Sequence, residues 1–170
     1  MQLDFQELHY IVQVKNNENL PVVDRESIAD LLTYSYTLYS HYKTQKKANK
    51  FSSYINHAFA IGDSLYVIYD FNNNHNKSTL ILYLPFIILF ATMGFKYGNR
   101  AKENQSQYIE YQQQYNSLKQ VINTASPQII NQIAKIWQEN KPDEKEQERN
   151  GLNPEIIKET VHHILMKYQR

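Results

Sequence analysis

The sequence contains one long uncharged apolar run, Thr79 to Phe95, which stands between basic flanks in an otherwise hydrophilic chain. As a helix, its seventeen residues would rise roughly 25 Å, the short limit for crossing the hydrocarbon core of a bilayer. Tyr83 and Tyr97 lie near its ends, where interfacial aromatic side chains are common. The run therefore predicts either a membrane span or a deeply buried element.

The two interpretations of this run treat Pro85 differently. In a membrane span, Pro85 lies inside the helix, and neighbouring groups must satisfy the carbonyl that loses its donor. In a soluble protein, residues 78–84 are the last strand of a sheet and Pro85 opens a buried helix. The basic residues after the run place its C-terminal side inside the cell, so that about 77 residues would have to cross the membrane. An all-round apolar helix in water needs a large core, which 170 residues barely provide. We therefore favour a single-pass membrane location over the alternative, a cytoplasmic one.

The part of the chain before this run, residues 1–77, predicts a small α+β lobe. Asp24 is a good N-cap for a helix over residues 24–47, whose apolar positions form one stripe. Gly62-Asp63 and the Asn-rich residues 72–77 predict turns. Segments rich in β-branched and aromatic residues predict strands over residues 8–15, 54–61, 64–71 and 78–84. The predicted fold is a small antiparallel sheet with a covering helix in the order β-α-β-β-β, followed by the apolar segment, residues 78–97, and C-terminal amphipathic helices.

Four lysines crowd the predicted end of the helix: Lys43, Lys46, Lys47 and Lys50. Positive charge is favoured at the C-terminus of a helix by the helix dipole. The cluster could also contact phosphate or lipid headgroups. In a chain with a net charge of +1, a solvated helix end is the favoured interpretation.

The second half of the chain predicts amphipathic helices. Over residues 98–140, apolar positions alternate spacings of three and four, an a/d seam typical of a helical hairpin or a bent helix. Ser126-Pro127 predicts a new helix start, with Ser as the N-cap and Pro at the first position. Residues 141–152 predict a charged linker, and residues 153–170 predict a terminal amphipathic helix capped by Asn153.

Two sets of side chains are candidates for binding. The apolar faces of the C-terminal helices exceed what short helices bury locally, and tyrosine is frequent at interfaces. We predict that a protein partner binds Tyr108, Tyr111, Tyr115, Leu118, Ile122, Ile157, Val161, Ile164 and Leu165. We predict that the membrane contacts Leu80, Ile81, Leu82, Leu84, Phe86, Ile87, Ile88, Leu89 and Phe90.

No group of residues predicts catalysis, a cofactor or a metal site. The chain has no cysteine, which excludes disulfides, thiolate zinc sites and a cysteine nucleophile. His162 and His163 are adjacent, so on a helix they point about 100° apart and cannot chelate one ion together. Gly94 and Gly98 have the spacing of close membrane-helix packing rather than of a phosphate loop. The near-neutral charge argues against nucleic acid as a partner, and no small-molecule substrate is indicated.

These observations predict a non-catalytic accessory or scaffolding subunit of a larger membrane-associated assembly, acting through protein–protein contacts. The alternative is a soluble α+β binding protein of the immunity-protein, secretion-chaperone or effector type, with one protein partner. The first residues carry two acids and no base before Lys15, which is unlike a signal or transit peptide. We therefore expect any membrane insertion to depend on the internal run.

Overall fold

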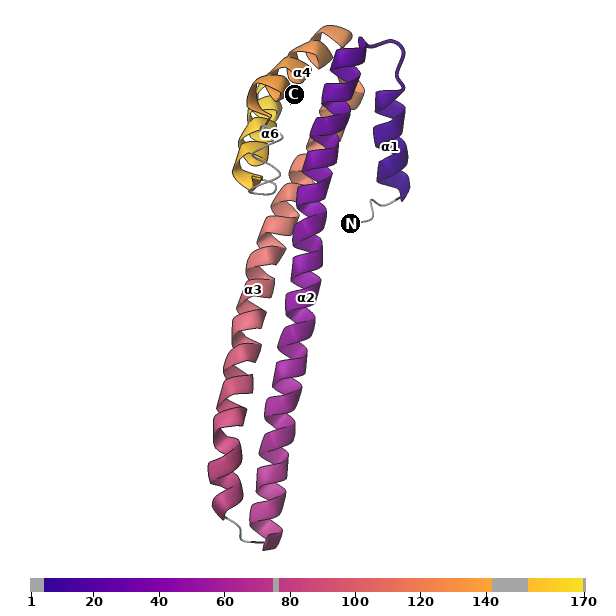
Figure 1. Ribbon diagram of the computed structural model, residues 1–170. Helices are drawn as coiled ribbons and strands as arrows, with labels where there is room; N and C mark the ends of the chain where they lie inside the picture. Colours follow the sequence, from indigo (N-terminus) through magenta and orange to yellow (C-terminus); the bar gives the residue numbers. More distant parts are fainter. Residues whose placement is uncertain (1–4, 75–76, 142–152, 170) are drawn as a thin grey trace. The chain divides into compact units, whose positions relative to one another are not determined.

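The computed structural model describes residues 5–74, 77–141 and 153–169. Within these residues the chain is helical and contains no strand (Figure 1). The helices are α1 (Phe5–Lys15), α2 (Val22–Asn74), α3 (Lys77–Thr124), α4 (Pro127–Asn140) and α6 (Pro154–Tyr168).

The predicted α+β lobe is therefore wrong. Residues 8–15 lie in α1, residues 54–61 and 64–71 lie in α2, and residues 78–84 lie in α3. The strand preference of aromatic and β-branched residues reflects their fit to a half-buried surface, so a helix that offers such a surface also accepts them. Gly62, predicted to form a turn, lies inside α2 because a single glycine costs a helix only about 1 kcal/mol. With so few strong breakers, nothing ends α2 for 53 residues.

Two further predictions, which depended on the predicted strands, are also wrong. Pro85 lies inside α3, so it does not open a helix after a strand, as the soluble interpretation required. The helix predicted to end near residue 47 continues to Asn74. Lys43 and Lys50 therefore lie in the middle of α2, where no helix terminus attracts their charge.

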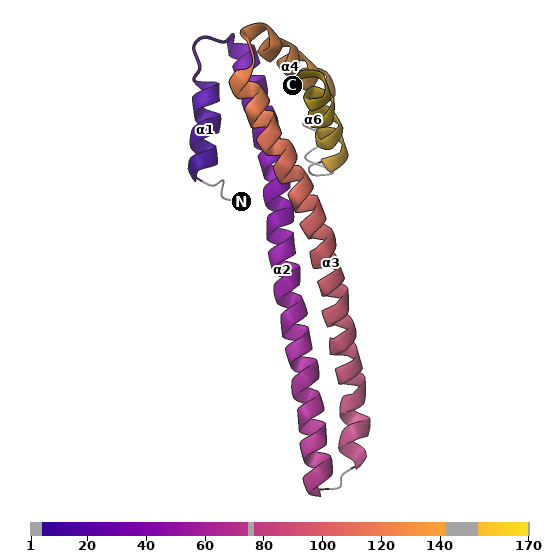
Figure 2. The same ribbon diagram turned by 180° about the vertical axis from the view of Figure 1, so that it is seen from behind.

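The chain divides into two compact units, to which α2 and α3 both contribute. Unit 1 comprises Met1–His41 and Tyr108–Arg170, and unit 2 comprises Tyr42–Gln107. Unit 1 has a conventional apolar core, in which α4 and α6 lie side by side (Figures 1 and 2). Its largest fully buried side chains are Ile28, Leu31, Leu32, Tyr115, Leu118, Ile133, Trp137, Ile157, Val161 and Ile164.

Two predicted helix starts in unit 1 are confirmed. Ser126 accepts a hydrogen bond from the backbone N–H of Ile129, and α4 begins at the proline that follows. Asn153 accepts one from the backbone N–H of Glu155 at the start of α6. Of the predicted charged linker, residues 142–152 lie outside the described residues.

Candidate functional site

Unit 2 consists of two antiparallel helical segments, from the second part of α2 and the first part of α3 (Figures 1 and 2). We call this pair the hairpin. The rings of Phe59 and Phe90 stack with their centroids 5.3 Å apart. Nearer the connection between the helices, the Thr79 hydroxyl donates a hydrogen bond to the Asp70 carboxylate, and both side chains are buried. These contacts fix which residues of the two segments lie level with one another.

The two helices approach each other closely at Gly94 and Gly98. The Ser53 hydroxyl donates a hydrogen bond of 2.8 Å to the carbonyl oxygen of Gly94. A Cβ atom on Gly94 would lie 2.7 Å from the imidazole of His57, and one on Gly98 would lie 3.3 Å from the Ser53 Oγ. The small-residue pair noted in the sequence therefore lies at the helix–helix contact inside the hairpin, where a Cβ on Gly94 would overlap the His57 ring and one on Gly98 would be tight against Ser53.

The outer surface of α2 in the hairpin is apolar. Between residues 51 and 71, each Ser, Asn, His and Asp side chain is buried or half-buried. The exposed positions are, apart from one glycine, all apolar or aromatic: Phe51, Tyr54, Ile55, Ala58, Phe59, Ile61, Gly62, Leu65, Tyr66, Ile68, Tyr69 and Phe71. This distribution is the reverse of that in unit 1, whose core is apolar.

The apolar run continues this surface on α3. Seven of the nine side chains predicted to contact the membrane are exposed, with Ile81 74% exposed, and Ile87 and Phe90 are half-buried. Only 11% of the most apolar part of α3 is buried. By length and composition, α3 is able to cross a membrane, and it is the one such helix among the described residues.

Several polar side chains of the hairpin form hydrogen bonds within it. Four of them donate hydrogen bonds of 2.7–2.8 Å to backbone carbonyl oxygens: Ser53, Asn56, Ser64 and Thr92. In hydrocarbon, an unpaired polar group costs several kcal/mol because no water can replace the lost partner. These internal bonds are therefore what a hairpin surrounded by lipid requires.

The predicted partner-binding residues occupy a different place in unit 1. Seven of the nine are buried among its helices, namely Tyr111, Tyr115, Leu118, Ile122, Ile157, Val161 and Ile164, while Tyr108 and Leu165 are half-buried. The ring of Tyr39 in α2 lies 6.0 Å from that of Tyr115 and 5.7 Å from that of Tyr108. A partner could reach the buried residues only if the helices separated, and partner binding through this set stays a prediction.

Sequence reasoning did not single out Glu7, which joins α1 to α3. Its carboxylate lies 2.8 Å from Lys119 Nζ and accepts a hydrogen bond of 2.7 Å from the Tyr115 hydroxyl. Burial and the negative charge of Glu7 raise the pKa of Tyr10 to about 12. Burial and the hydrogen bond to Glu7 also raise the pKa of Tyr115. Both phenols therefore keep their protons, which suits a structural contact. No local sequence pattern reveals the contacts of Glu7, because more than a hundred residues separate it from Tyr115 and Lys119.

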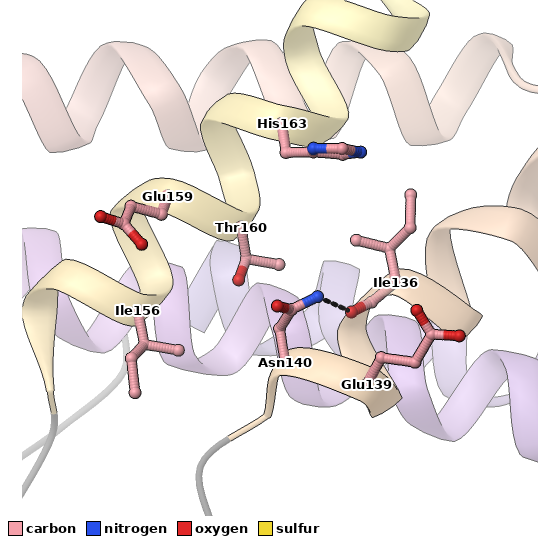
Figure 3. Close-up of a pocket in the computed structure, with 7 residues that line it drawn as sticks. All are labelled: Ile136, Glu139, Asn140, Ile156, Glu159, Thr160 and His163. Carbon is pink, nitrogen blue, oxygen red and sulfur yellow. Dashed lines mark hydrogen bonds between the residues drawn. The ribbon is translucent and has the colours of Figure 1, made fainter.

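A groove between α4 and α6 is the other candidate site (Figure 3). It has a volume of about 560 Å³ and is lined by Ile136, Glu139, Asn140, Ile156, Glu159, Thr160 and His163. The Asn140 amide donates a hydrogen bond of 2.7 Å to the carbonyl oxygen of Ile136 in its own helix. Across the described residues, no three His, Asp or Glu side chains are placed to hold a metal ion. The groove therefore carries no arrangement that assigns a reaction to it.

No family model matches the chain, and no curated protein or solved structure is significantly similar to it. The hairpin and the chemistry of its residues are therefore the features of the molecule that point to a function.

Proposed function

We propose that this protein is a membrane-anchored, non-catalytic accessory or scaffolding subunit. In this proposal the hairpin is inserted in a lipid bilayer, and unit 1 is a helical domain at the membrane surface that contacts other proteins. The observation that carries the proposal is the reversed polarity of the hairpin over residues 51–71 of α2, where the polar side chains are buried or half-buried and the exposed ones are apolar or aromatic, together with the exposed apolar run of α3.

The dimensions of the apolar surface support this proposal. On α2 it extends from Phe51 to Phe71, about 30 Å at 1.5 Å per residue, which equals the thickness of a typical hydrocarbon core. Each large apolar side chain moved from water into hydrocarbon contributes about 1.5–3 kcal/mol. Soluble monomers rarely expose apolar patches larger than a few hundred Å², so a continuous surface of this length on two helices needs a covering partner.

The composition of unit 1 supports a hairpin that enters and leaves through one face of the membrane. Residues before and after the hairpin fold together, as the ion pair of Glu7 with Lys119 and the hydrogen bonds from Asn131 to Asp24 illustrate. Segments that pack into one compact unit lie on the same side of a membrane. A hairpin therefore replaces, in this proposal, the single span favoured from the sequence, and it removes the need to move about 77 residues across.

In such a hairpin α2 is less apolar than α3. The contacts between the two helices explain how α2 can nevertheless be inserted in lipid. Ser53, His57 and Asp70 of α2 face α3 rather than the exterior. A polar side chain that is hydrogen-bonded inside a helix pair avoids most of the cost of burial in hydrocarbon.

Alkaline carbonate extraction of membranes from cells that express the full chain tests the proposal. We expect wild type to remain in the pellet, and Leu82→Arg combined with Ile88→Arg to be released, because each arginine in the bilayer costs about 3 kcal/mol. A matched control, Val23→Arg with Met166→Arg, places the same charges at exposed apolar positions of unit 1 and should remain in the pellet. A wild-type chain that is folded and monodisperse without detergent, as monomer or oligomer, would contradict membrane anchoring.

A further inference from the structure

We infer that the open end of the hairpin, where the chain enters and leaves unit 2, is a binding site for anionic lipid headgroups. This inference rests on the proposed membrane insertion. The site, called the basic end below, consists of the α2 residues Lys43, Lys46, Lys47 and Lys50 and the α3 residues Lys96, Arg100 and Lys102.

The position of the lysines in the middle of α2 excludes stabilisation of their charge by the dipole at a helix C-terminus. Lysines gather at helix C-termini because the dipole favours positive charge there, within the last turn. The helix continues for many residues beyond Lys50, as far as Asn74. The charge of this cluster is therefore not stabilised by a helix end.

The contact between the helices brings both basic stretches to one level. Because Ser53 lies against Gly98, the antiparallel register places Lys50 about level with Arg100. The basic residues also border the apolar exterior directly. Lys50 precedes Phe51 in α2, and Lys96 follows Phe95 in α3, where both phenylalanines are about two-thirds exposed.

The charge at this end is predominantly positive. Residues 43–50 and 96–102 contain no Asp or Glu, and the acid of unit 2 beside them is Glu103, which follows Lys102; Asp63 and Asp70 lie farther along the hairpin. The Lys50 ammonium lies 5.7 Å from the centre of the Tyr54 ring, which is 62% exposed. A lysine beside an aromatic ring at the edge of an apolar surface is typical of the membrane interface, where the charge reaches the headgroups.

These side chains are suited to bind phosphate groups, because ammonium and guanidinium groups form charge-assisted hydrogen bonds with phosphate. The continuity of the basic end with the apolar exterior favours the phosphates of a bilayer over those of a nucleic acid. The site also sets the orientation, with unit 1 on the side of the anionic leaflet and only the connection between α2 and α3 reaching the far side.

Flotation of the purified full chain with vesicles tests this inference. The vesicles contain phosphatidylcholine alone or with about a third phosphatidylglycerol. The variant is Lys47→Gln, Lys50→Gln, Lys96→Gln and Arg100→Gln together. The control has the same net charge and carries Lys15→Gln, Arg25→Gln, Lys135→Gln and Lys167→Gln, all in unit 1.

We expect wild type to bind the anionic vesicles more tightly and to lose this preference at high salt. Each basic residue near an anionic surface contributes about fivefold, so the basic-end variant should bind at least about 100-fold more weakly. The control should stay within about threefold of wild type, because charges away from the interface are screened by salt.

Cysteine labelling separates failure of this inference from failure of the proposed function. The chain lacks cysteine, so Asn73→Cys at the end of α2 and Asn16→Cys in unit 1 each provide a single site for a membrane-impermeant maleimide. Membrane insertion predicts that only Asn16→Cys is labelled until detergent is added, which then exposes Asn73→Cys as well. Labelling of both sites with either lipid would refute the membrane insertion itself.

Two other results would overturn only the headgroup site. In the first, Asn73→Cys is protected from the maleimide equally in both kinds of vesicle, and the basic-end variant binds anionic vesicles as tightly as wild type. In the second, the variant keeps its vesicle binding but loses binding to single-stranded RNA, which would assign the basic end to nucleic acid.

Discussion

Replacement of Gly94 by alanine tests the packing of the hairpin, because Gly62 provides a matched control inside the same unit. An alanine in a helix interior is more favourable than a glycine by about 1 kcal/mol. No atom lies within 4 Å of a Cβ placed on Gly62, so Gly62→Ala should gain this amount. At Gly94 the added methyl group would lie 2.7 Å from the His57 ring, and overpacking of this kind costs about 1–3 kcal/mol. The two variants should therefore differ in local stability by about 1–3 kcal/mol.

Amide hydrogen exchange of hairpin peptides is the suitable assay, because it reports the free energy of local opening rather than the stability of the whole chain. The full chain would be studied in a mild detergent. We expect faster exchange in Gly94→Ala than in Gly62→Ala, and the difference should disappear when both are combined with His57→Ala, which removes the obstructing ring. If Gly94→Ala were as protected as Gly62→Ala with His57 present, α2 and α3 would not pack closely at this level.

Three further predictions concern unit 1. In the folded chain the pKa of Tyr10, about 12, lies above the unfolded value of about 10. Its stabilising effect is therefore complete below pH 10 and is lost as the pH rises through about 12. The loss should be about 1 kcal/mol once solvent screening of this half-buried phenol is allowed for, and chemical unfolding of wild type and of Tyr10→Phe should reveal it. Ser126→Ala removes the N-cap of α4, and thermal unfolding should show a loss of about 1 kcal/mol. Trp137→Ala empties a fully buried site and should cost about 3–5 kcal/mol in denaturant unfolding; a loss below about 1 kcal/mol would contradict the described core.

Part of the candidate site could be predicted from sequence because it is local. The uncharged run and its basic flanks are contiguous, so their composition alone separates them from the rest of the chain. The sequence predicts two strands in the α2 half of the hairpin, because its polar residues lower its average hydrophobicity and its aromatic residues suit a sheet. A helical signal was nevertheless present. Small or polar residues recur at the spacing of one helix face, at Ser53, His57, Ala60 and Ser64.

Within unit 1, the sequence correctly predicted the starts of α4 and α6. Ser126 and Asn153 act through backbone groups two or three residues away, so their role is visible in a short stretch of sequence. The contact of Glu7 with Lys119 joins residues 112 positions apart and depends on how α1 packs. The burial of the predicted partner-binding face is a tertiary outcome of the same kind.

By itself, the sequence determined where the chain is apolar, where it is basic and where α4 and α6 begin, because each of these properties belongs to neighbouring residues. Only the tertiary structure decided that α2 and α3 are long antiparallel helices and which side chains lie between them. Helix pairing turns polar residues of α2 inward and leaves apolar residues outside. The physical reason is that the polarity of a surface depends on which face of each helix is covered, and that choice is made by contacts between residues distant in sequence.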